Sequence, residues 1–234
     1  MALHASHFTL HSSQSVAVFI MAKAPRPGAV KTRLGPVLSP EDAAEIARAF
    51  LLDKIEQLKT LERATPAIAH APASERRLFE ELAPGVDLIP QEGEDLGARL
   101  ANSFEQFLAK GYAGALAVDA DTPTLPQAFL QRAVDLIRHP EVDLVLGPTE
   151  DGGYYLIGLR KLYRELFQEM TWSTAEVLPE TIRRAETLGL RVGCLPAWFD
   201  IDTPDDLARL ERSLQQHDGH EPRHTRRFFL DRAQ

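Results

Sequence analysis

Apolar runs and amphipathic segments alternate along most of this chain. Short apolar, β-prone runs predict strands over residues 16–22, 67–69, 86–89, 115–118, 143–147, 154–159 and 191–195. Apolar positions at helical spacing and N-terminal capping signals predict helices over residues 39–59, 74–82, 97–110, 126–138, 162–167, 174–188 and 203–214. Because strands and helices alternate, we expect a three-layer α/β/α fold with a mainly parallel central sheet covered on both faces.

The chain is long enough for one domain. Its 234 residues, 44% of them hydrophobic, suit a single α/β domain with a sizeable core. We expect this domain over residues 16–215, between a flexible head over 1–15 and a flexible tail over 216–234. Residues 226–230 of the tail mix basic and apolar side chains, so docking on the domain or on a partner subunit is the alternative to disorder. A homodimer is one assembly that we consider.

Composition narrows the class of protein. The net charge of −8 argues against a binder of duplex nucleic acid. A single cysteine, Cys194, is too few for a disulfide framework or a cysteine zinc cluster within one chain. No apolar run approaches the roughly 18 residues of a membrane helix, and residues 1–15 lack the pattern of a signal peptide. We therefore expect a soluble, cytoplasmic protein that binds neither nucleic acid nor membrane.

The positions of the histidines restrict the chemistry. Only His70 and His139 fall within the body that we expect to fold, and we interpret both as structural or surface residues. A Ser-His-Asp or Cys-His mechanism therefore has few candidates. The chemistry must rest mainly on carboxylates, lysine, arginine and a metal.

A basic loop follows the first predicted strand. Its cations surround Gly28, and they are Lys23, Arg26, Lys31 and Arg33. In an open α/β sheet, ligands bind beyond the carboxyl ends of strands, and such a loop suits a phosphate chain. The loop is not a Walker A motif, because Val30 stands where the glycine before Lys-Thr belongs. We favour phosphate binding over the alternative of a solvated basic loop.

Two acidic segments each follow a predicted strand or β-prone run and precede Thr-Pro. Alternation places Asp119 and Asp121 on one side of the chain, and Asp200 and Asp202 form the second segment. Carboxylates gathered at strand ends repel one another unless a cation compensates. We therefore predict Asp121 and Asp202 as ligands of a divalent metal. Asp119 is expected to meet a nucleotide ribose or a lysine of the basic loop.

Three further segments are candidates for ligand contact. Asp151-Gly152-Gly153 allows close approach of the backbone to a ligand, and a hairpin turn at Asp-Gly is compatible with that role. Trp172 precedes a predicted helix and belongs either to an acceptor pocket or to the core. The polar segment around Asp95 is interpreted as a lid or a base-binding loop.

Together these segments resemble a GT-A-type, glycosyltransferase-like family of the nucleotide-diphospho-sugar transferase superfamily. Members of that family are often found beside radical-SAM genes, and some are linked to arsenosugar biosynthesis. The resemblance covers residues 16–214. It rests on the basic loop 23–34, residues 93–100, Asp121 with Pro123, residues 147–155, residues 172–174 and residues 200–207. The sequence departs from the family at Asp119, because a neutral Ile-Gly-Ser-like lead is expected before Asp121.

The resemblance implies a Rossmann-like GT-A fold and a role for each matching segment. The basic loop would hold nucleotide phosphates, with Asp121 and Asp202 holding Mg²⁺ or Mn²⁺ between the α- and β-phosphates. The turn at residues 151–153 and the region near Trp172 would face the acceptor. Members of the superfamily include sugar transferases and nucleotidyltransferases, and phospholactate guanylyltransferases share the general layout.

Three functions are considered on these grounds. The first is a metal-dependent transfer of a sugar from a nucleotide sugar to a small-molecule acceptor, with Lys31, Asp121 and Asp151 as catalytic residues. In it, Lys31 stabilises the charge of the leaving diphosphate, and Asp151 orients or deprotonates the acceptor. The alternative is a nucleotidyltransferase that uses a nucleoside triphosphate and releases pyrophosphate. The third is a nucleotide-binding protein without turnover.

Overall fold

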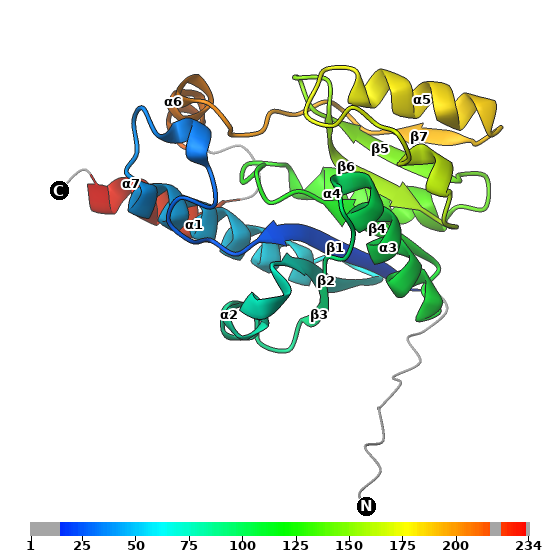
Figure 1. The fold of residues 1–234 in the computed structure, drawn as a ribbon, viewed down its shortest axis with the longest axis horizontal. Coiled ribbons are helices and arrows are strands. Elements are labelled where there is room, and N and C mark those ends of the chain that lie inside the picture. Colours follow the sequence, from blue (N-terminus) through cyan, green and yellow to red (C-terminus); the bar gives the residue numbers. More distant parts are fainter. Residues whose placement is uncertain (1–14, 216–220, 233–234) are drawn as a thin grey trace, which may run out of the picture.

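The computed structural model describes residues 15–215 and 221–232 (Figure 1). The strands are β1 (Val16–Lys23), β2 (Ala64–Ala71), β3 (Asp87–Pro90), β4 (Gly114–Val118), β5 (Leu144–Pro148), β6 (Tyr154–Leu159) and β7 (Val192–Cys194). The helices are α1 (Pro40–Lys59), α2 (Arg76–Leu82), α3 (Leu96–Ala109), α4 (Gln127–Arg138), α5 (Val177–Thr187), α6 (Pro204–Ser213) and α7 (Arg223–Arg232). The 3₁₀ turns are η1 (Thr32–Leu34), η2 (Ala73–Glu75) and η3 (Arg164–Leu166).

One seven-stranded sheet forms the middle layer, in the order β3-β2-β1-β4-β6-β5-β7. The pairs β1–β2, β1–β4, β2–β3 and β5–β7 are parallel, whereas β6 runs antiparallel to both β4 and β5. The predicted three-layer fold with a mainly parallel sheet is therefore confirmed. β6 is antiparallel because a short turn, rather than a crossover helix, connects it to β5.

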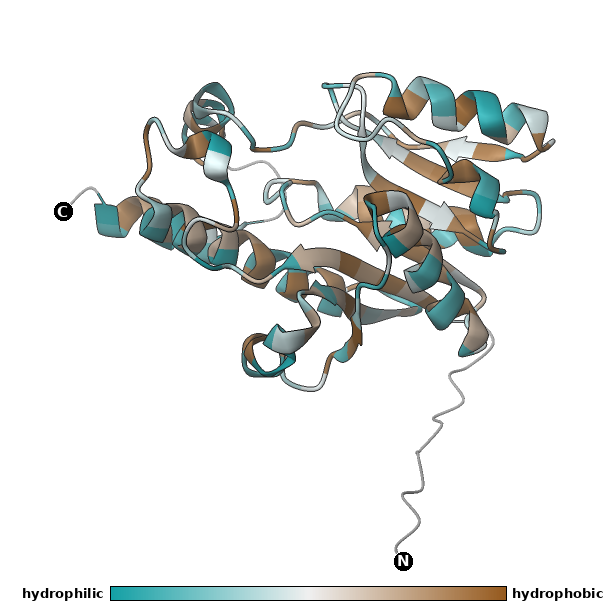
Figure 2. Ribbon diagram, viewed as in Figure 1, coloured by the Kyte–Doolittle hydropathy of each residue, from teal (hydrophilic) through white to brown (hydrophobic). Residues whose placement is uncertain are grey.

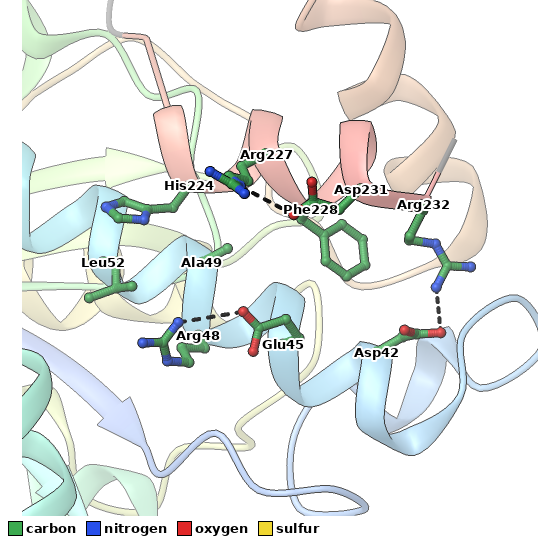
Figure 3. Close-up of a pocket in the computed structure, with 10 residues that line it drawn as sticks. All are labelled: Asp42, Glu45, Arg48, Ala49, Leu52, His224, Arg227, Phe228, Asp231 and Arg232. Atoms are coloured by element: carbon green, nitrogen blue, oxygen red, sulfur yellow. Dashed lines mark hydrogen bonds and ion pairs between the residues drawn. The ribbon is translucent and has the colours of Figure 1, made fainter. Parts of the chain in front are cut away.

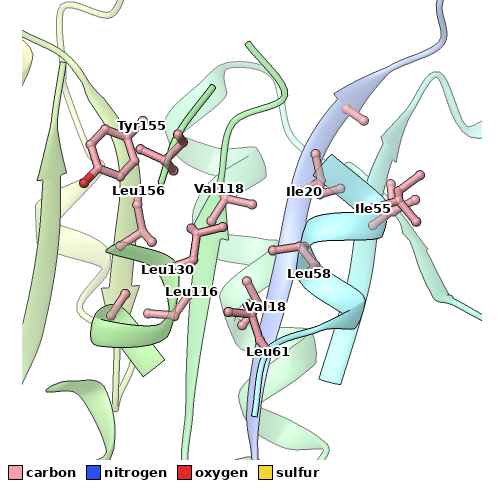
Figure 4. Close-up of a cluster of buried hydrophobic side chains, with 14 of the residues drawn as sticks. Val18, Ile20, Ile55, Leu58, Leu61, Leu116, Val118, Leu130, Tyr155 and Leu156 are labelled. Carbon is pink, nitrogen blue, oxygen red and sulfur yellow. The ribbon is translucent and has the colours of Figure 1, made fainter. Parts of the chain in front are cut away.

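The sheet is buried on both faces. Val18 and Ile20 of β1 pack with Ile55 and Leu58 of α1 on one face (Figure 4). Phe19 lies between Val18 and Ile20 in the strand, and it packs against α3 on the other face of the sheet. This alternation follows from the two-residue period of a strand, and burial on both faces explains why the strands read as continuous apolar runs. Figure 2 shows β1 as a largely hydrophobic strand.

The predicted capping signals act as expected. The Ser39 side chain accepts a hydrogen bond from the Asp42 N–H at the start of α1, and Pro40 occupies the first turn. Thr203 and Asp206 form a reciprocal capping box at the start of α6. These caps fix where the loops that precede both helices end.

Two segments differ from the sequence prediction. The helix expected over residues 162–167 is only the 3₁₀ turn η3. Within the tail that we expected to be flexible, residues 223–232 form α7, which packs along α1 (Figure 1). The alternative of docking on the same domain is the one observed. Residues 216–220 and 233–234, and the head over 1–14, lie outside the described residues.

A buried carboxylate anchors α7. Asp53 of α1 accepts hydrogen bonds from the His224 N–H (2.9 Å), the Thr225 N–H (2.8 Å) and the Thr225 hydroxyl (2.6 Å). These donors belong to the first turn of α7, where N–H groups have no partner within the helix. Phe228 adds apolar contact in a third hydrophobic cluster with Leu34, Phe50, Ile201 and Leu210, among others.

The first prediction concerns this anchor. Asp53→Asn should lower the free energy of unfolding by about 1–3 kcal/mol, because a charged acceptor of several buried hydrogen bonds becomes a neutral amide. Urea denaturation followed by circular dichroism measures the change. The control Glu45→Gln removes an exposed ion pair with Arg48 on the same helix and should leave the stability nearly unchanged. Equal stability of Asp53→Asn and the parent protein would contradict the assignment.

Candidate functional site

The basic loop and the first acidic segment leave the sheet at the same edge. β1 and β4 are neighbouring parallel strands, with Ile20 opposite Val118 near their carboxyl ends. Residues 24–39 connect β1 to α1, and residues 119–126 follow β4. The second acidic segment joins them through the backbone, because the Ile201 N–H donates to the Asp121 carbonyl at 3.0 Å. Three loops far apart in the sequence therefore meet at one place.

Lys31 lies between the two predicted metal ligands. Its ammonium is 2.7 Å from Asp121 Oδ1, 3.0 Å from Asp202 Oδ1 and 2.6 Å from the Ile201 carbonyl oxygen. The Lys31 side chain is 5% exposed, whereas each carboxylate is 41% exposed. Burial alone would lower the pKa of Lys31, but the charges of Asp121 and Asp202 outweigh it and raise the pKa above its usual value.

A pocket of about 530 Å³ opens beside these groups. This volume is typical of small-molecule sites. Its charged lining residues are Lys23, Lys31, Arg33, Arg99, Asp121 and Asp202, and Gln91, Leu96 and Ser173 contribute to the wall. The basic loop, the loop after β4, the segment before α6 and the start of α3 thus surround one cavity.

The acidic groups around this pocket crowd one another. Burial and then the charges of Asp151, Asp202 and Asp121 raise the pKa of Asp200 to about 6. A further cation would relieve this repulsion. Asp121 and Asp202 reach the pocket and offer carboxylate oxygens, which are the ligands that Mg²⁺ and Mn²⁺ prefer. The residues present therefore fit a divalent cation held by Asp121 and Asp202.

Several predicted site residues have other partners. Arg26 forms a two-pronged ion pair with Glu75 at 2.7 and 3.1 Å, and the Asp95 carboxylate caps α3 by accepting from the Ala98 N–H. Gly28 adopts a φ of 75°, which glycine tolerates, but it does not line the pocket. Arg26, Gly28 and Asp95 therefore belong to loops that border the pocket but do not themselves line it.

The turn at residues 151–153 has a clear structural role. Asp151 Oδ1 accepts hydrogen bonds from the Thr149 hydroxyl (2.5 Å) and the Gly153 N–H (3.1 Å). Gly152 has a φ of 91°, and a Cβ there would lie 2.5 Å from the Ala175 carbonyl oxygen. The turn therefore packs closely under the segment before α5, and none of its three residues lines the pocket.

Trp172 is half-buried and packs against the hydrophobic cluster on the α3 face of the sheet, and it does not line the pocket. Its ring packs edge-on against Tyr154, and its Nε1 is buried without a hydrogen-bond partner among the described residues. A Cβ at Gly97 would lie 3.1 Å from this nitrogen and 2.3 Å from the Phe167 carbonyl oxygen. The close approach of the Phe167 carbonyl thus requires glycine at position 97. The residue after Trp172, Ser173, lines the pocket, whereas Trp172 does not.

Sequence reasoning missed two polar residues of the pocket. Gln91 Nε2 donates to the carbonyl oxygens of Ala69 (2.8 Å) and Ala22 (3.2 Å), so it joins the ends of β1 and β2. Arg99 Nε donates to the Gly93 carbonyl at 3.0 Å. Arg99 lies in the first turn of α3, which follows a polar, glycine-containing loop. That position is the sequence feature from which its place in the pocket could have been predicted.

A second pocket, of about 440 Å³, lies between α1 and α7 (Figure 3). Its charged side chains largely pair with one another, as in Arg227–Asp231 and Arg232–Asp42. Asp53, Glu56 and His224 are close enough together nearby to hold a metal. However, Asp53 already accepts three hydrogen bonds from α7, and Glu56 pairs with Arg223. We therefore assign this region to the docking of α7.

Solved structures share this fold over most of the chain. A candidate nucleotide-diphospho-sugar transferase from Desulfovibrio desulfuricans G20 matches with a TM-score of 0.83 and 31% identity, covering 91% of this chain and 94% of that one. A CMP:2-keto-3-deoxy-manno-octonic acid synthetase complexed with CTP matches with a TM-score of 0.56 and 13% identity, covering 86% and 99%, which shows the fold alone. The architecture is that of nucleotidyltransferases and nucleotide-diphospho-sugar transferases.

The particular family follows from the sequence. The family described as "Uncharacterized protein conserved in bacteria (DUF2064)" matches residues 54–174, and the chain belongs to it. A 2-phospho-L-lactate guanylyltransferase from Methanothermobacter thermautotrophicus is 26% identical over 185 residues, 77% of this chain and 78% of that protein. These relatives confirm the prediction of a transferase. The radical-SAM and arsenosugar association stays a prediction. No helix in the described part of the chain is long and apolar enough to cross a membrane.

The second prediction tests the pair of carboxylates. Asp121→Asn and Asp202→Asn should each weaken Mn²⁺-dependent binding of nucleotide by about tenfold or more, because each removes a charged oxygen ligand. Calorimetric titration of GTP with and without Mn²⁺ measures the effect. The control Asp205→Asn alters an exposed acid of the same segment that does not line the pocket, and it should bind like the parent. Unchanged affinity in both site variants would refute the metal site.

Proposed function

We propose that this protein is a metal-dependent nucleotidyltransferase that transfers a nucleoside monophosphate from a nucleoside triphosphate to a small anionic acceptor. This reading replaces sugar transfer as the favoured function. Curated relatives at 26–28% identity are named 2-phospho-L-lactate guanylyltransferase, which is one reason for the change. The acceptor class, an acid that carries a phosphate group, is taken from the same names.

The charge of the pocket lining is the observation that carries the proposal. Four cationic and two anionic side chains line it, a net charge of +2. A divalent cation held by Asp121 and Asp202 would bring the lining to +4. A nucleoside triphosphate carries roughly −4 at neutral pH, whereas the diphosphate of a nucleotide sugar carries about −2. The lining therefore complements the triphosphate more closely.

The proposed reaction is an in-line displacement. An acceptor oxygen attacks the α-phosphorus, the bond from that phosphorus to the bridging oxygen of the β-phosphate breaks, and pyrophosphate leaves with the electron pair. When bound, the metal supplies positive charge to the phosphates. Lys23, Lys31 and Arg33 orient the triphosphate and offset the charge that builds on the leaving pyrophosphate.

Lys31 has a second role in the protein without bound substrate. Its ammonium neutralises Asp121 and Asp202, which would otherwise repel each other in a partly buried place. A divalent metal held by Asp121 and Asp202 would supply positive charge to this pair in place of Lys31. The Lys31 ammonium could then bind a phosphate oxygen within the same pocket.

The third prediction tests the reaction class. With Mg²⁺ or Mn²⁺ and 2-phospho-L-lactate or a related phosphorylated acid, one nucleoside triphosphate of the four should release pyrophosphate and form a nucleotidylated product. A coupled pyrophosphate assay with mass spectrometry of the product measures this. Nucleotide sugars are tested in parallel for release of a nucleoside diphosphate. Turnover of a sugar donor without any pyrophosphate release from triphosphates would establish the rival function.

The fourth prediction concerns Lys31. Lys31→Ala should weaken GTP binding by about tenfold or more and change guanosine binding little, because the proposed contact of Lys31 with the nucleotide is to phosphate and not to the nucleoside. Calorimetry with both ligands gives the comparison. Arg26→Ala is the matched control, since Arg26 lies in the same loop but pairs with Glu75 outside the pocket. Equal losses for GTP and guanosine would count against a phosphate-binding lysine.

A further inference from the structure

α1 carries buried polar side chains that face the loop after β4. Lys54 and Gln57 are each 1% exposed, although neighbouring positions of the helix, Leu51, Ile55 and Leu58, pack as ordinary core residues. A buried ammonium without partners is very costly, so its hydrogen bonds are held firmly once they form. The partners of Lys54 therefore identify which segment this helix restrains.

Lys54 binds the residue that follows Asp121. Its Nζ donates to the Thr122 carbonyl oxygen at 3.0 Å and to the Thr122 hydroxyl at 3.1 Å. That hydroxyl in turn donates to Asp119 Oδ1 at 2.7 Å. Burial raises the pKa of Asp119 and lowers that of Lys54, and the opposite charge of each group limits the shift of the other. Asp119 is thus part of a charged network behind Asp121 rather than a residue of the pocket wall.

The loop after β4 depends on such contacts for its shape. β4 ends at Val118, and residues 119–126 precede α4. Besides Lys54, Gln57 Nε2 donates to the Leu125 carbonyl at 2.6 Å, and Trp198 Nε1 donates to the Thr124 hydroxyl at 3.3 Å. Of these three side chains, Lys54 contacts the residue nearest in sequence to Asp121. The Asp121 carbonyl also accepts from the Ile201 N–H, so the tether extends to the neighbour of Asp202.

We infer that Lys54 is a positioning residue for the Asp121–Asp202 pair. By fixing Thr122 it sets the direction in which Asp121 leaves the sheet, and through the Asp121–Ile201 hydrogen bond it sets the spacing to Asp202. The inference rests on the proposed function, because the spacing matters if the two carboxylates hold one cation. A residue that only stabilises the fold would leave cation affinity unchanged in the folded protein.

The fifth prediction compares two substitutions at the same interface. Lys54→Met keeps the length and apolar stem of the side chain but removes its donors, and Gln57→Leu removes the donor to Leu125. Both should lower the urea midpoint. In the folded state, only Lys54→Met should weaken binding of Mn²⁺ in the presence of GTP, by about tenfold, because a shift of Asp121 spoils the shared coordination. Electron paramagnetic resonance of free Mn²⁺ measures the binding directly.

A second variant keeps the test decisive if Lys54→Met does not fold. Lys54→Met/Asp119→Asn removes both buried charges, so neither is left without its counterpart. Its Thr122 hydroxyl retains an acceptor at position 119, and the loop loses only the tether to α1. This double variant should fold and still bind Mn²⁺ more weakly than the parent protein by about tenfold.

The outcomes separate this inference from the proposed function. The parent protein and Asp121→Asn are measured first with Mn²⁺ and GTP. If binding depends on Asp121 and the Lys54 variants match the parent, the positioning role is refuted and the proposed function stands. Equal weakening by Gln57→Leu would also refute it, because any loss at the interface would then suffice. If the parent shows no Asp121-dependent binding, the proposed function fails and the inference fails with it.

Discussion

The repulsion between Asp121 and Asp202 is the constraint on which the site depends. Both carboxylates come from loops and lie within hydrogen-bond distance of one ammonium, that of Lys31. Without a cation between them, like charges in a partly buried place would drive the two loops apart. Lys31 reaches this position from a left-handed backbone conformation, with a φ of 49°. The loop thus holds Lys31 in a strained backbone conformation that places its ammonium between the two acids.

A small hydrophobic cluster holds these loops from below. Leu34 follows the basic loop and Ile201 precedes Asp202, and both are fully buried together with Phe50 of α1. Phe228 of α7 completes the same cluster. α7 therefore contributes to the site only indirectly, because it packs in the cluster that supports the loops. α1 connects the whole arrangement, because one helix carries Phe50, the anchor for α7 and the tether for the loop after β4.

The sequence predicted the architecture, and it predicted that Asp121 and Asp202 lie close together, for physical reasons that operate locally. A continuous apolar run such as residues 16–22 requires a strand buried on both faces, and acids directly after a strand must lie at its carboxyl end. The features that the sequence did not predict depend on tertiary contacts. Arg26 and Asp95 were predicted to contact a ligand, but in the structure Arg26 pairs with Glu75, and Asp95 accepts a hydrogen bond from the Ala98 N–H of α3. Lys54 looks like a surface lysine of an amphipathic helix, and its burial follows only from the loop that packs against it. The segment that forms α7 is too polar to be predicted as a packed helix from its own sequence, because its docking depends on the hydrogen bonds that Asp53 accepts.

The distribution of charge connects the acids to the cations of the pocket. The protein carries a net charge of −8, yet the pocket lining is cationic. Charges beyond about 8 Å are largely screened at physiological ionic strength, so the local cations decide whether a polyphosphate binds. A nucleoside triphosphate that enters with a divalent metal carries roughly −2 rather than −4, which reduces the repulsion from the acidic remainder of the surface. In the proposed function, Asp121 and Asp202 would hold the metal while Lys23 and Arg33 would contact the phosphates. The two aspartates and the basic loop line the same pocket, so under the proposed function they would act together in holding a polyphosphate with its metal.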